Sequence, residues 1–261
     1  MPILNLDDID LYYEVVGEGA PLLFVHGLGS SSRDWEEQVD FFANRYKVIV
    51  FDVRGHGKSG KPSGPYSIPL FATDTAKMLK ALGVGPAHVV GISMGGMIAF
   101  QMAVSRPGMV RSLVIVNSSP EFLIRKFKER MQVWQRFLIV RLLGMRKMGE
   151  VLSRRLFPKA EHKGLRAVFV ERWAENDARA YREAMGAIVG WSVADQIENI
   201  RCSTLVIASE GDYTPVAVKR AYVERMARAE LVVIEDARHA LPAERPEEFN
   251  AAIEAFLVEQ A

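Results

Sequence analysis

Residues 89–97 read VVGISMGGM, and this stretch decides the fold. An apolar, β-branched run (residues 87–92, AHVVGI) leads directly into Ser93, with Gly91 two residues before it and Gly95 two residues after it. Glycine is unfavourable inside helices and strands, so glycines crowded at this point indicate a tight turn. A helical pattern follows at residues 95–107. A strand, a G-x-S-x-G turn and a helix in succession are the setting of a nucleophile elbow.

The two glycines that flank Ser93 have a steric purpose in such a turn. A serine presented in this way adopts strained backbone angles, and side chains two residues to either side would collide; Gly91 and Gly95 remove those side chains. The hydroxyl then points into open space at the carboxyl edge of a sheet, where the N-terminus of the next helix favours developing negative charge. The motif therefore indicates a nucleophilic Ser93, and a glycine-rich turn for close helix packing is the alternative.

Short apolar runs elsewhere in the chain predict the strands of this sheet. Runs without polar alternation are typical of parallel strands covered on both faces, and they occur at residues 22–25, 48–51, 88–90, 113–116, 205–208 and 231–234. The first 17 residues alternate like an antiparallel hairpin strand, and helical patterns occur at residues 69–82, 94–105, 217–227 and 247–258. This repetition predicts a doubly wound, mostly parallel α/β sheet.

One segment interrupts the repetition. No strand pattern is found from about Ser119 to Asp195, so we interpret residues 119–195 as a helical cap domain inserted into a core domain of residues 1–118 and 196–261. Between Glu121 and Lys159, eleven basic and three acidic residues give a net charge of +8, against −7 for the rest of the chain. A basic, amphipathic face can bind an anionic membrane or acidic ligands. We favour a solvated face of the cap over membrane contact.

Composition excludes several classes of protein. The 33 basic and 32 acidic residues leave a net charge of +1, without the basic excess typical of nucleic-acid-binding proteins. The single cysteine, Cys202, excludes an intramolecular disulfide and a multi-cysteine metal site. Because zinc-protease and phosphate-loop motifs are also absent from the sequence, we expect no metal and no cofactor. The acidic, alternating N-terminus and the lack of an apolar run of about 18 residues favour a cytoplasmic protein.

A serine hydroxyl is a weak nucleophile, so a catalytic Ser93 needs a base and an acid that orients the base. In this architecture they are expected in the order serine, acid, histidine, on loops after later strands. Asp212 follows one predicted strand and His239 follows the next, and carboxyl ends of parallel strands meet at one edge. Glu210 and Asp236 are weaker candidates for the acid.

Acyl transfer also needs donors for an oxyanion. One backbone N–H is expected from the residue after the nucleophile, Met94, and the other from the loop after an early strand. Residues 26–29 (HGLG) directly follow the apolar run at 22–25, and Leu28 would supply the second N–H. Taken alone, this short segment is also compatible with an ordinary turn.

These features together resemble the α/β-hydrolase superfamily over nearly the whole chain. The motifs that carry the resemblance, in the family's order and spacing, are HGLG (26–29), FDVRGHGKS (51–59), GISMGG (91–96), GDYTP (211–215) and RHALPAERP (238–246). The resemblance implies a catalytic triad of Ser93, Asp212 and His239. It also implies an oxyanion hole formed by Leu28 and Met94. It also implies that Asp52, Arg54 and His56 brace a loop, and that the cap shapes the acyl pocket.

Within this superfamily, the spacing is similar to that of small carboxylesterases and 3-oxoadipate enol-lactonases. A serine at the elbow argues against epoxide hydrolases and haloalkane dehalogenases, which use aspartate there. The Ala-Leu-Pro sequence after His239 argues against carbon–carbon bond hydrolases, which often carry a tryptophan there. Perhydrolase activity, which is known on this scaffold, stays open.

We therefore expect a hydrolase that cleaves a small-molecule carboxylic ester through an acyl-serine intermediate. One alternative is an enol-lactonase or carbon–carbon bond hydrolase, whose acidic substrate would need a cap arginine such as Arg125, Arg141 or Arg154. Another is a binding module without catalysis. Four apolar residues of the cap are candidates for the pocket wall, although packing in the core explains them better: Trp134, Phe137, Leu138 and Trp191.

Overall fold

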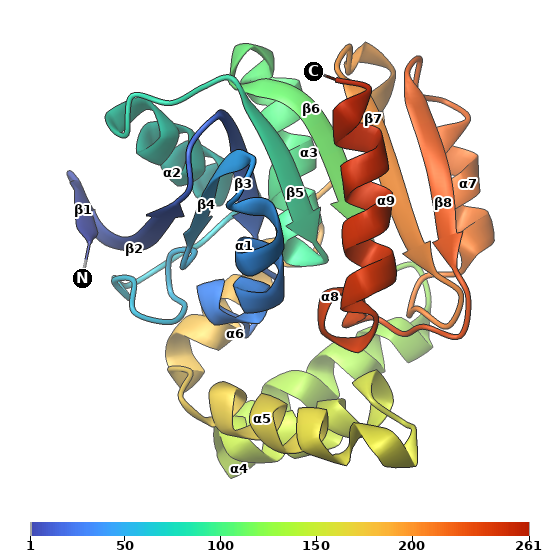
Figure 1. The fold of residues 1–261 in the computed structure, drawn as a ribbon. Helices are drawn as coiled ribbons and strands as arrows, with labels where there is room; N and C mark the ends of the chain where they lie inside the picture. Colours follow the sequence, from blue (N-terminus) through green and yellow to red (C-terminus); the bar gives the residue numbers. More distant parts are fainter. Residues whose placement is uncertain (1, 261) are drawn as a thin grey trace.

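The computed structural model describes residues 2–260 and contains an eight-stranded sheet (Figure 1). The strands are ordered β1-β2-β4-β3-β5-β6-β7-β8; β1, β2 and β4 pair antiparallel, and the other pairs are parallel. Their bounds are β1 (Ile3–Leu6), β2 (Ile9–Val16), β3 (Ala20–Val25), β4 (Tyr46–Phe51), β5 (Ala87–Ile92), β6 (Val110–Val116), β7 (Ser203–Ser209) and β8 (Ala229–Ile234).

Helices cover both faces of the sheet. One face carries α1 (Glu36–Phe42) and α9 (Pro246–Val258), and the other carries α2 (Ile68–Ala81), α3 (Met94–Ser105) and α7 (Val216–Val223) (Figure 1). The short helix α8 (Leu241–Glu244) precedes α9, and short 3-10 turns lie at Ser32–Trp35, Pro107–Met109, Ala160–His162 and Ile197–Asn199. The chain thus forms the three layers expected when a parallel sheet is buried on both sides.

The alternation of side chains along the strands divides the core in two. In β3, Leu22 and Phe24 point to the cluster under α1 and α9, whereas Leu23 and Val25 point to the cluster under α2 and α3. All four side chains have no exposed surface. Because both faces are apolar, these strands show no polar alternation in the sequence.

The predicted doubly wound sheet is confirmed, with each predicted strand within one of the observed strands and the N-terminal hairpin formed by β1 and β2. Two differences are local. Helix α1 was not predicted, since its apolar positions are few and it begins directly after a 3-10 turn. Helix α7 ends at Val223, four residues before the predicted end, and a turn covers the remainder.

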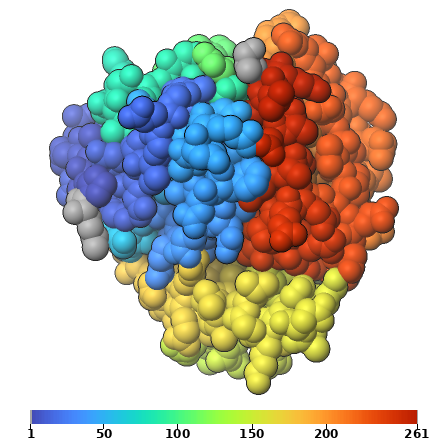
Figure 2. Space-filling model, viewed as in Figure 1, coloured from blue at the N-terminus to red at the C-terminus, as the bar shows by residue number. Residues whose placement is uncertain are grey.

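The segment 119–195, which we call the cap, lies across the carboxyl ends of the strands (Figure 1). It contains α4 (Phe127–Leu156), which kinks at Gly144, α5 (Lys163–Ala174) and α6 (Ala178–Ile188). Within the described residues of this segment, strand pairing is limited to one isolated bridge, Glu121 with Ser192, in keeping with the helical prediction. Figure 2 shows the atoms of the cap packed against those of the N-terminal and C-terminal parts of the core.

Candidate active site

The turn at Ser93 has the strained backbone that the glycine pattern predicted. Ser93 lies between β5 and α3 with φ 54° and ψ −117°. Residues other than glycine rarely adopt a positive φ of this kind. A Cβ on Gly91 would lie 2.3 Å from the Gly95 carbonyl oxygen, and a Cβ on Gly95 would lie 2.0 Å from the Val25 carbonyl oxygen. Both glycines are therefore required by backbone atoms that have no room to move aside.

His239 and Asp212 come together at the carboxyl ends of β8 and β7. Nδ1 of His239 lies 2.5 Å from Oδ1 of Asp212, whose carboxylate is fully buried. The Tyr213 ring stacks on the imidazole with 4.4 Å between ring centroids. The histidine ring is thus held from two sides, which suits a base that must keep one orientation.

Asp212 has a second ionic partner that the sequence analysis missed. Nζ of Lys219, on α7, donates to Oδ2 of Asp212 at 2.5 Å, and both side chains have no exposed surface. Burial alone would raise the pKa of the Asp212 carboxyl. The hydrogen bond from His239 and the charges of His239 and Lys219 outweigh burial and hold that pKa below its ordinary value. Asp212 is therefore a carboxylate at neutral pH.

Asn117, the residue directly after β6, ties the loop that carries His239 to the sheet. Its Nδ2 donates to the carbonyl oxygens of Arg238 and His239 at 3.2 and 3.1 Å and to Oγ of Ser209 at 2.8 Å. Its Oδ1 accepts from the Ser209 N–H at 2.9 Å. The sequence does not indicate this tethering role, because it depends on contacts with residues about 90 and 120 positions away.

The loop of residues 26–29 lies beside Ser93, because β3 and β5 are neighbours in register from Leu22 with His88 to Val25 with Gly91. A Cβ on Gly27 would lie 3.4 Å from the Cβ of Ser93. His26 anchors the loop: its Nδ1–H donates to the Gly27 carbonyl at 2.8 Å, and its Nε2 accepts from the Val53 N–H at 2.9 Å. Burial lowers the pKa of His26, which favours this neutral ring.

The predicted brace around Asp52 and Arg54 is confirmed. Oδ1 of Asp52 accepts from the Ser32 N–H and Oδ2 from the Lys58 N–H, both at 2.7 Å. Arg54 makes a buried bidentate pair with Asp74, at 2.7 and 2.9 Å. His56 is buried against His26, and burial together with that neighbour lowers its pKa to about 3. These contacts hold the loop after β4 in place and are structural.

Ser93, His239 and Leu28 line one cavity of about 280 Å³ between the core and the cap. Met94, the first residue of α3, follows Ser93 in the chain and is buried. The cap side of the cavity is apolar and consists mainly of residues from the end of α4 and from α5: Leu156, Phe157, Leu165, Val168, Phe169 and Trp173. A site that combines Ser93 and His239 with an apolar wall suits a substrate with a small polar centre and an apolar group.

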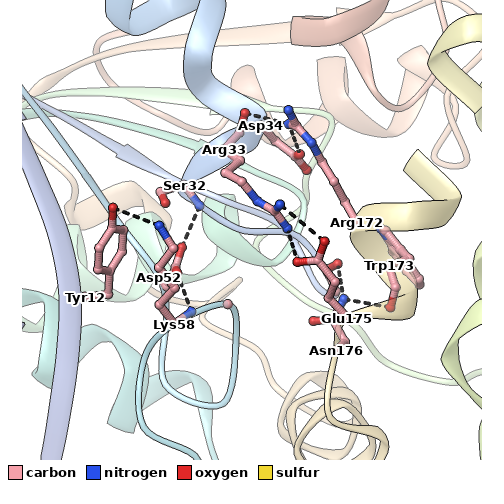
Figure 3. Close-up of polar contacts among 12 residues, drawn as sticks. Tyr12, Ser32, Arg33, Asp34, Asp52, Lys58, Arg172, Trp173, Glu175 and Asn176 are labelled. Carbon is pink, nitrogen blue, oxygen red and sulfur yellow. Dashed lines mark hydrogen bonds and ion pairs between the residues drawn. The ribbon is translucent and has the colours of Figure 1, made fainter. Parts of the chain in front are cut away.

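Ion pairs across the boundary between core and cap form the rim of this cavity (Figure 3). Arg172 of α5 contacts Asp34 at 3.0 Å and Glu36 at 2.7 Å, and Arg33 contacts Glu175 at 2.5 Å. A second, more polar cavity of about 130 Å³ lies among these residues. The arginines at the rim are thus already paired with carboxylates of the protein.

The cap also contacts the loop at 26–29. Nδ2 of Asn176 donates to the Gly29 carbonyl at 2.9 Å, and a Cβ on Gly29 would lie 2.8 Å from the ring of Trp173. Gly29 has φ +74°, so glycine is needed there for both the backbone and the indole. The loop that would supply Leu28 is therefore held by both core and cap.

The other candidates for the catalytic acid and for the pocket wall make different contacts or are exposed. Glu210 accepts from the Asp236 N–H at 3.1 Å, and Asp236 pairs with Lys159 on the surface. None of the four aromatic or aliphatic cap candidates belongs to the cavity wall described here. Trp191 packs in the core, where its indole N–H donates to Gln101, and Phe137 packs inside the cap, whereas Trp134 is 55% exposed.

In residues 2–260, no cluster of three or more His, Cys, Asp or Glu side chains is arranged to hold a metal ion. Over the same residues, no helix has the length and apolar character needed to cross a membrane.

Comparisons with known proteins agree with this geometry. A family model described as alpha/beta hydrolase fold matches residues 20–246. A protein of Azorhizobium caulinodans named for carbamate hydrolysis is 31% identical over 98% of both chains, and 3-oxoadipate enol-lactonase 2 of Acinetobacter baylyi is 30% identical over 97% of this chain and 95% of its own. A thermophilic esterase from Thermogutta terrifontis has a TM-score of 0.88 and 25% identity, covering 97% of this chain and 94% of its own. The chain belongs to the α/β-hydrolase fold family and is a hydrolase.

Proposed function

We propose that this hydrolase cleaves a small-molecule carboxylic ester through an acyl-serine intermediate. Ser93 is the nucleophile, His239 the general base and acid, and Asp212 the carboxylate that orients the imidazole. The observation that carries the proposal is the shared cavity: Ser93 and His239 face the same space, and His239 is paired with a buried carboxylate behind it.

The reaction follows from these positions. His239 takes the proton of Ser93 as the hydroxyl oxygen attacks the ester carbonyl, and Asp212 stabilises the imidazolium that forms. The N–H groups of Leu28 and Met94 hold the oxyanion, and loss of one such donor typically costs about 100- to 1000-fold in kcat. His239 then protonates the leaving alcohol, and it activates the water that releases the acid from Ser93.

The charge around the cavity favours an uncharged ester over an acidic substrate. A carboxylate on the substrate needs a free cation near the cavity, but Arg33 and Arg172 are engaged by Glu175, Asp34 and Glu36. The cavity wall described above contains none of the three cap arginines, Arg125, Arg141 and Arg154, any one of which would serve the enol-lactonase hypothesis. Arg125 instead pairs with Glu121 on the surface. The apolar wall from α4 and α5 therefore suits an aliphatic or aromatic acyl group.

An enol-lactonase is the second candidate, because one relative at 30% identity carries that name. It requires that one rim arginine exchange its protein carboxylate for the carboxylate of the substrate. Arg172→Met would then raise KM for a carboxylate-bearing lactone much more than KM for a neutral ester.

The test uses p-nitrophenyl esters from acetate to decanoate, with burst kinetics on the wild-type chain and on Ser93→Ala. We expect a burst, a rate maximum at one chain length, and loss of both in the variant. A fluorophosphonate should label Ser93 in the wild-type chain.

Two outcomes contradict the proposal in different ways. Absence of both turnover and labelling would exclude a serine esterase. Labelling with turnover confined to lactones that carry a carboxylate would favour the enol-lactonase.

A further inference from the structure

A lysine lies behind the proposed triad, although ester hydrolysis does not itself require one there. Lys219 is on α7, and none of its side chain is exposed. Its Nζ donates to Oδ2 of Asp212 at 2.5 Å and to the Thr214 carbonyl oxygen at 2.8 Å. Both partners are acceptors, so the geometry is that of an ammonium group shared between a carboxylate and a backbone carbonyl.

Stability alone does not explain this pair. Taking an ammonium and a carboxylate out of water is costly, and apolar residues of similar volume often serve the fold as well or better. The neighbours of Lys219 on α7 illustrate the point, because Tyr222 and Val223 are buried there without charge. What distinguishes Lys219 is its contact with the carboxylate of the triad.

We propose that Lys219 is a positioning residue of the active site, an inference that rests on the proposed function. It fixes the Asp212 carboxylate so that Oδ1 faces His239, and it balances the negative charge of that carboxylate. As a result, the imidazole of His239 faces a carboxylate whose negative charge is balanced on its other oxygen.

The electrostatic argument has a definite sign. A carboxylate next to an imidazole favours the protonated ring, and a cation on the other carboxylate oxygen opposes that effect. With Lys219 present, Asp212 and Lys219 together carry no net charge. Without it, the carboxylate would hold a proton on His239 up to higher pH, and the acidic limb of kcat/KM would move upward.

Other charged or titratable groups near this pair do not produce the same effect. The Tyr222 hydroxyl donates to the Ser118 carbonyl, and burial raises its pKa; the pKa of Tyr213, whose ring is covered on one side by His239, is also raised. Both tyrosines are therefore neutral across the acidic limb. Further charged groups reach the loops of Asp212 and His239 and are common to every variant below. They are Arg136 and Arg155 of α4, Arg238, whose guanidinium lies against Gly211, and Glu244 of α8, which accepts from the Arg238 N–H.

The experiment compares Lys219→Met, which removes the charge and the donor, with Lys219→Gln, which keeps a donor. Arg220→Met is the matched control, because it removes an exposed cation one residue further along α7. Rates on the best p-nitrophenyl ester are measured from pH 4 to 9 and divided by the active sites counted with a fluorophosphonate. That normalisation removes any loss caused by incomplete folding.

We expect the acidic limb of kcat/KM to move up by about one pH unit in both Lys219 variants. Lys219→Met should also lose on the order of tenfold in kcat with little change in KM, since Asp212 loses the anchor of Oδ2. Arg220→Met should match the wild-type chain. Lys219 variants whose limb coincides with that of the wild-type chain, per labelled site, would overturn the inference and leave Lys219 a purely structural residue.

A second readout separates this inference from the proposed function. The ring signals of His239, assigned with His239→Gln, are followed by NMR against pH in the absence of substrate. A higher titration midpoint in Lys219→Gln supports the coupling even if no ester is hydrolysed. An unchanged midpoint contradicts it even if the esterase proposal holds.

Discussion

The elbow glycine Gly95 offers a severe test of the site geometry. A Cβ added there would lie 2.0 Å from the Val25 carbonyl oxygen and 2.7 Å from the His26 carbonyl oxygen. Real Cβ contacts are essentially never below 3.0 Å, so the elbow and the end of β3 must separate by about 1 Å in Gly95→Ala. Both obstructing atoms are backbone, which leaves no side chain to rotate away.

That displacement falls between Ser93 and the loop that would supply Leu28. A misplacement of about 1 Å in a catalytic arrangement can cost about 100-fold in rate, and overpacking a core typically costs about 1–3 kcal/mol of stability. We therefore expect Gly95→Ala to lose about 100-fold in kcat per labelled site on the best p-nitrophenyl ester. Urea unfolding should show the accompanying loss of stability.

Gly186→Ala is the matched control. Gly186 also lies in a helix, α6, and a Cβ there meets nothing within 4 Å. Replacing glycine by alanine in an open helical position typically gains up to about 1 kcal/mol. Gly186→Ala should therefore be slightly more stable and equally active. If Gly95→Ala kept the kcat and unfolding midpoint of the wild-type chain, the argument that backbone contacts fix the elbow would be wrong.

Three further predictions concern the brace, the cap boundary and pH. Asp74→Ala leaves the buried Arg54 guanidinium with the exposed Asp8 as its ionic partner and should cost about 3 kcal/mol in urea unfolding; Arg54→Met with Asp74→Leu should recover most of that loss. Arg172→Ala removes the pairs to Asp34 and Glu36, which are partly exposed, and should change stability by less than about 1 kcal/mol. The same variant should shift the preferred acyl length in the p-nitrophenyl series. Burial lowers the pKa of His88 to about 4, so the unfolded chain binds the extra proton first and stability should fall as pH drops from 6.5 to 4; His88→Gln, followed by thermal unfolding, should weaken that slope.

Local patterns made the fold and the chemical residues predictable. Strands β5, β7 and β8 each lead into a turn or loop that carries one candidate group, so the positions of Ser93, Asp212 and His239 follow from strand order in the sequence. The steric reason for Gly91 and Gly95 also follows from the elbow itself. The catalytic roles of Ser93, Asp212 and His239 stay predictions until turnover is measured.

Contacts between distant segments were not predictable in the same way. Lys219 looks like an ordinary solvated lysine in the sequence VAVKRAYV, and only the packing of α7 against the end of β7 buries it on Asp212. The residues of the cavity wall were not predicted, for a related reason. Trp134 and Leu156 both belong to α4, but the helix has several apolar faces, and the sequence does not indicate which face meets the core.

The cap does more than line the cavity. Trp173 forms part of the cavity wall and also packs against Gly29, and Asn176, just after α5, binds the Gly29 carbonyl. The loop that would supply the Leu28 N–H is held on its other side by His26 and its contact with Val53. A substitution of Trp173 that enlarges the cavity will therefore also release one side of this loop. Because an oxyanion donor acts only when it is held in place, we expect such a substitution to change acyl preference and rate together.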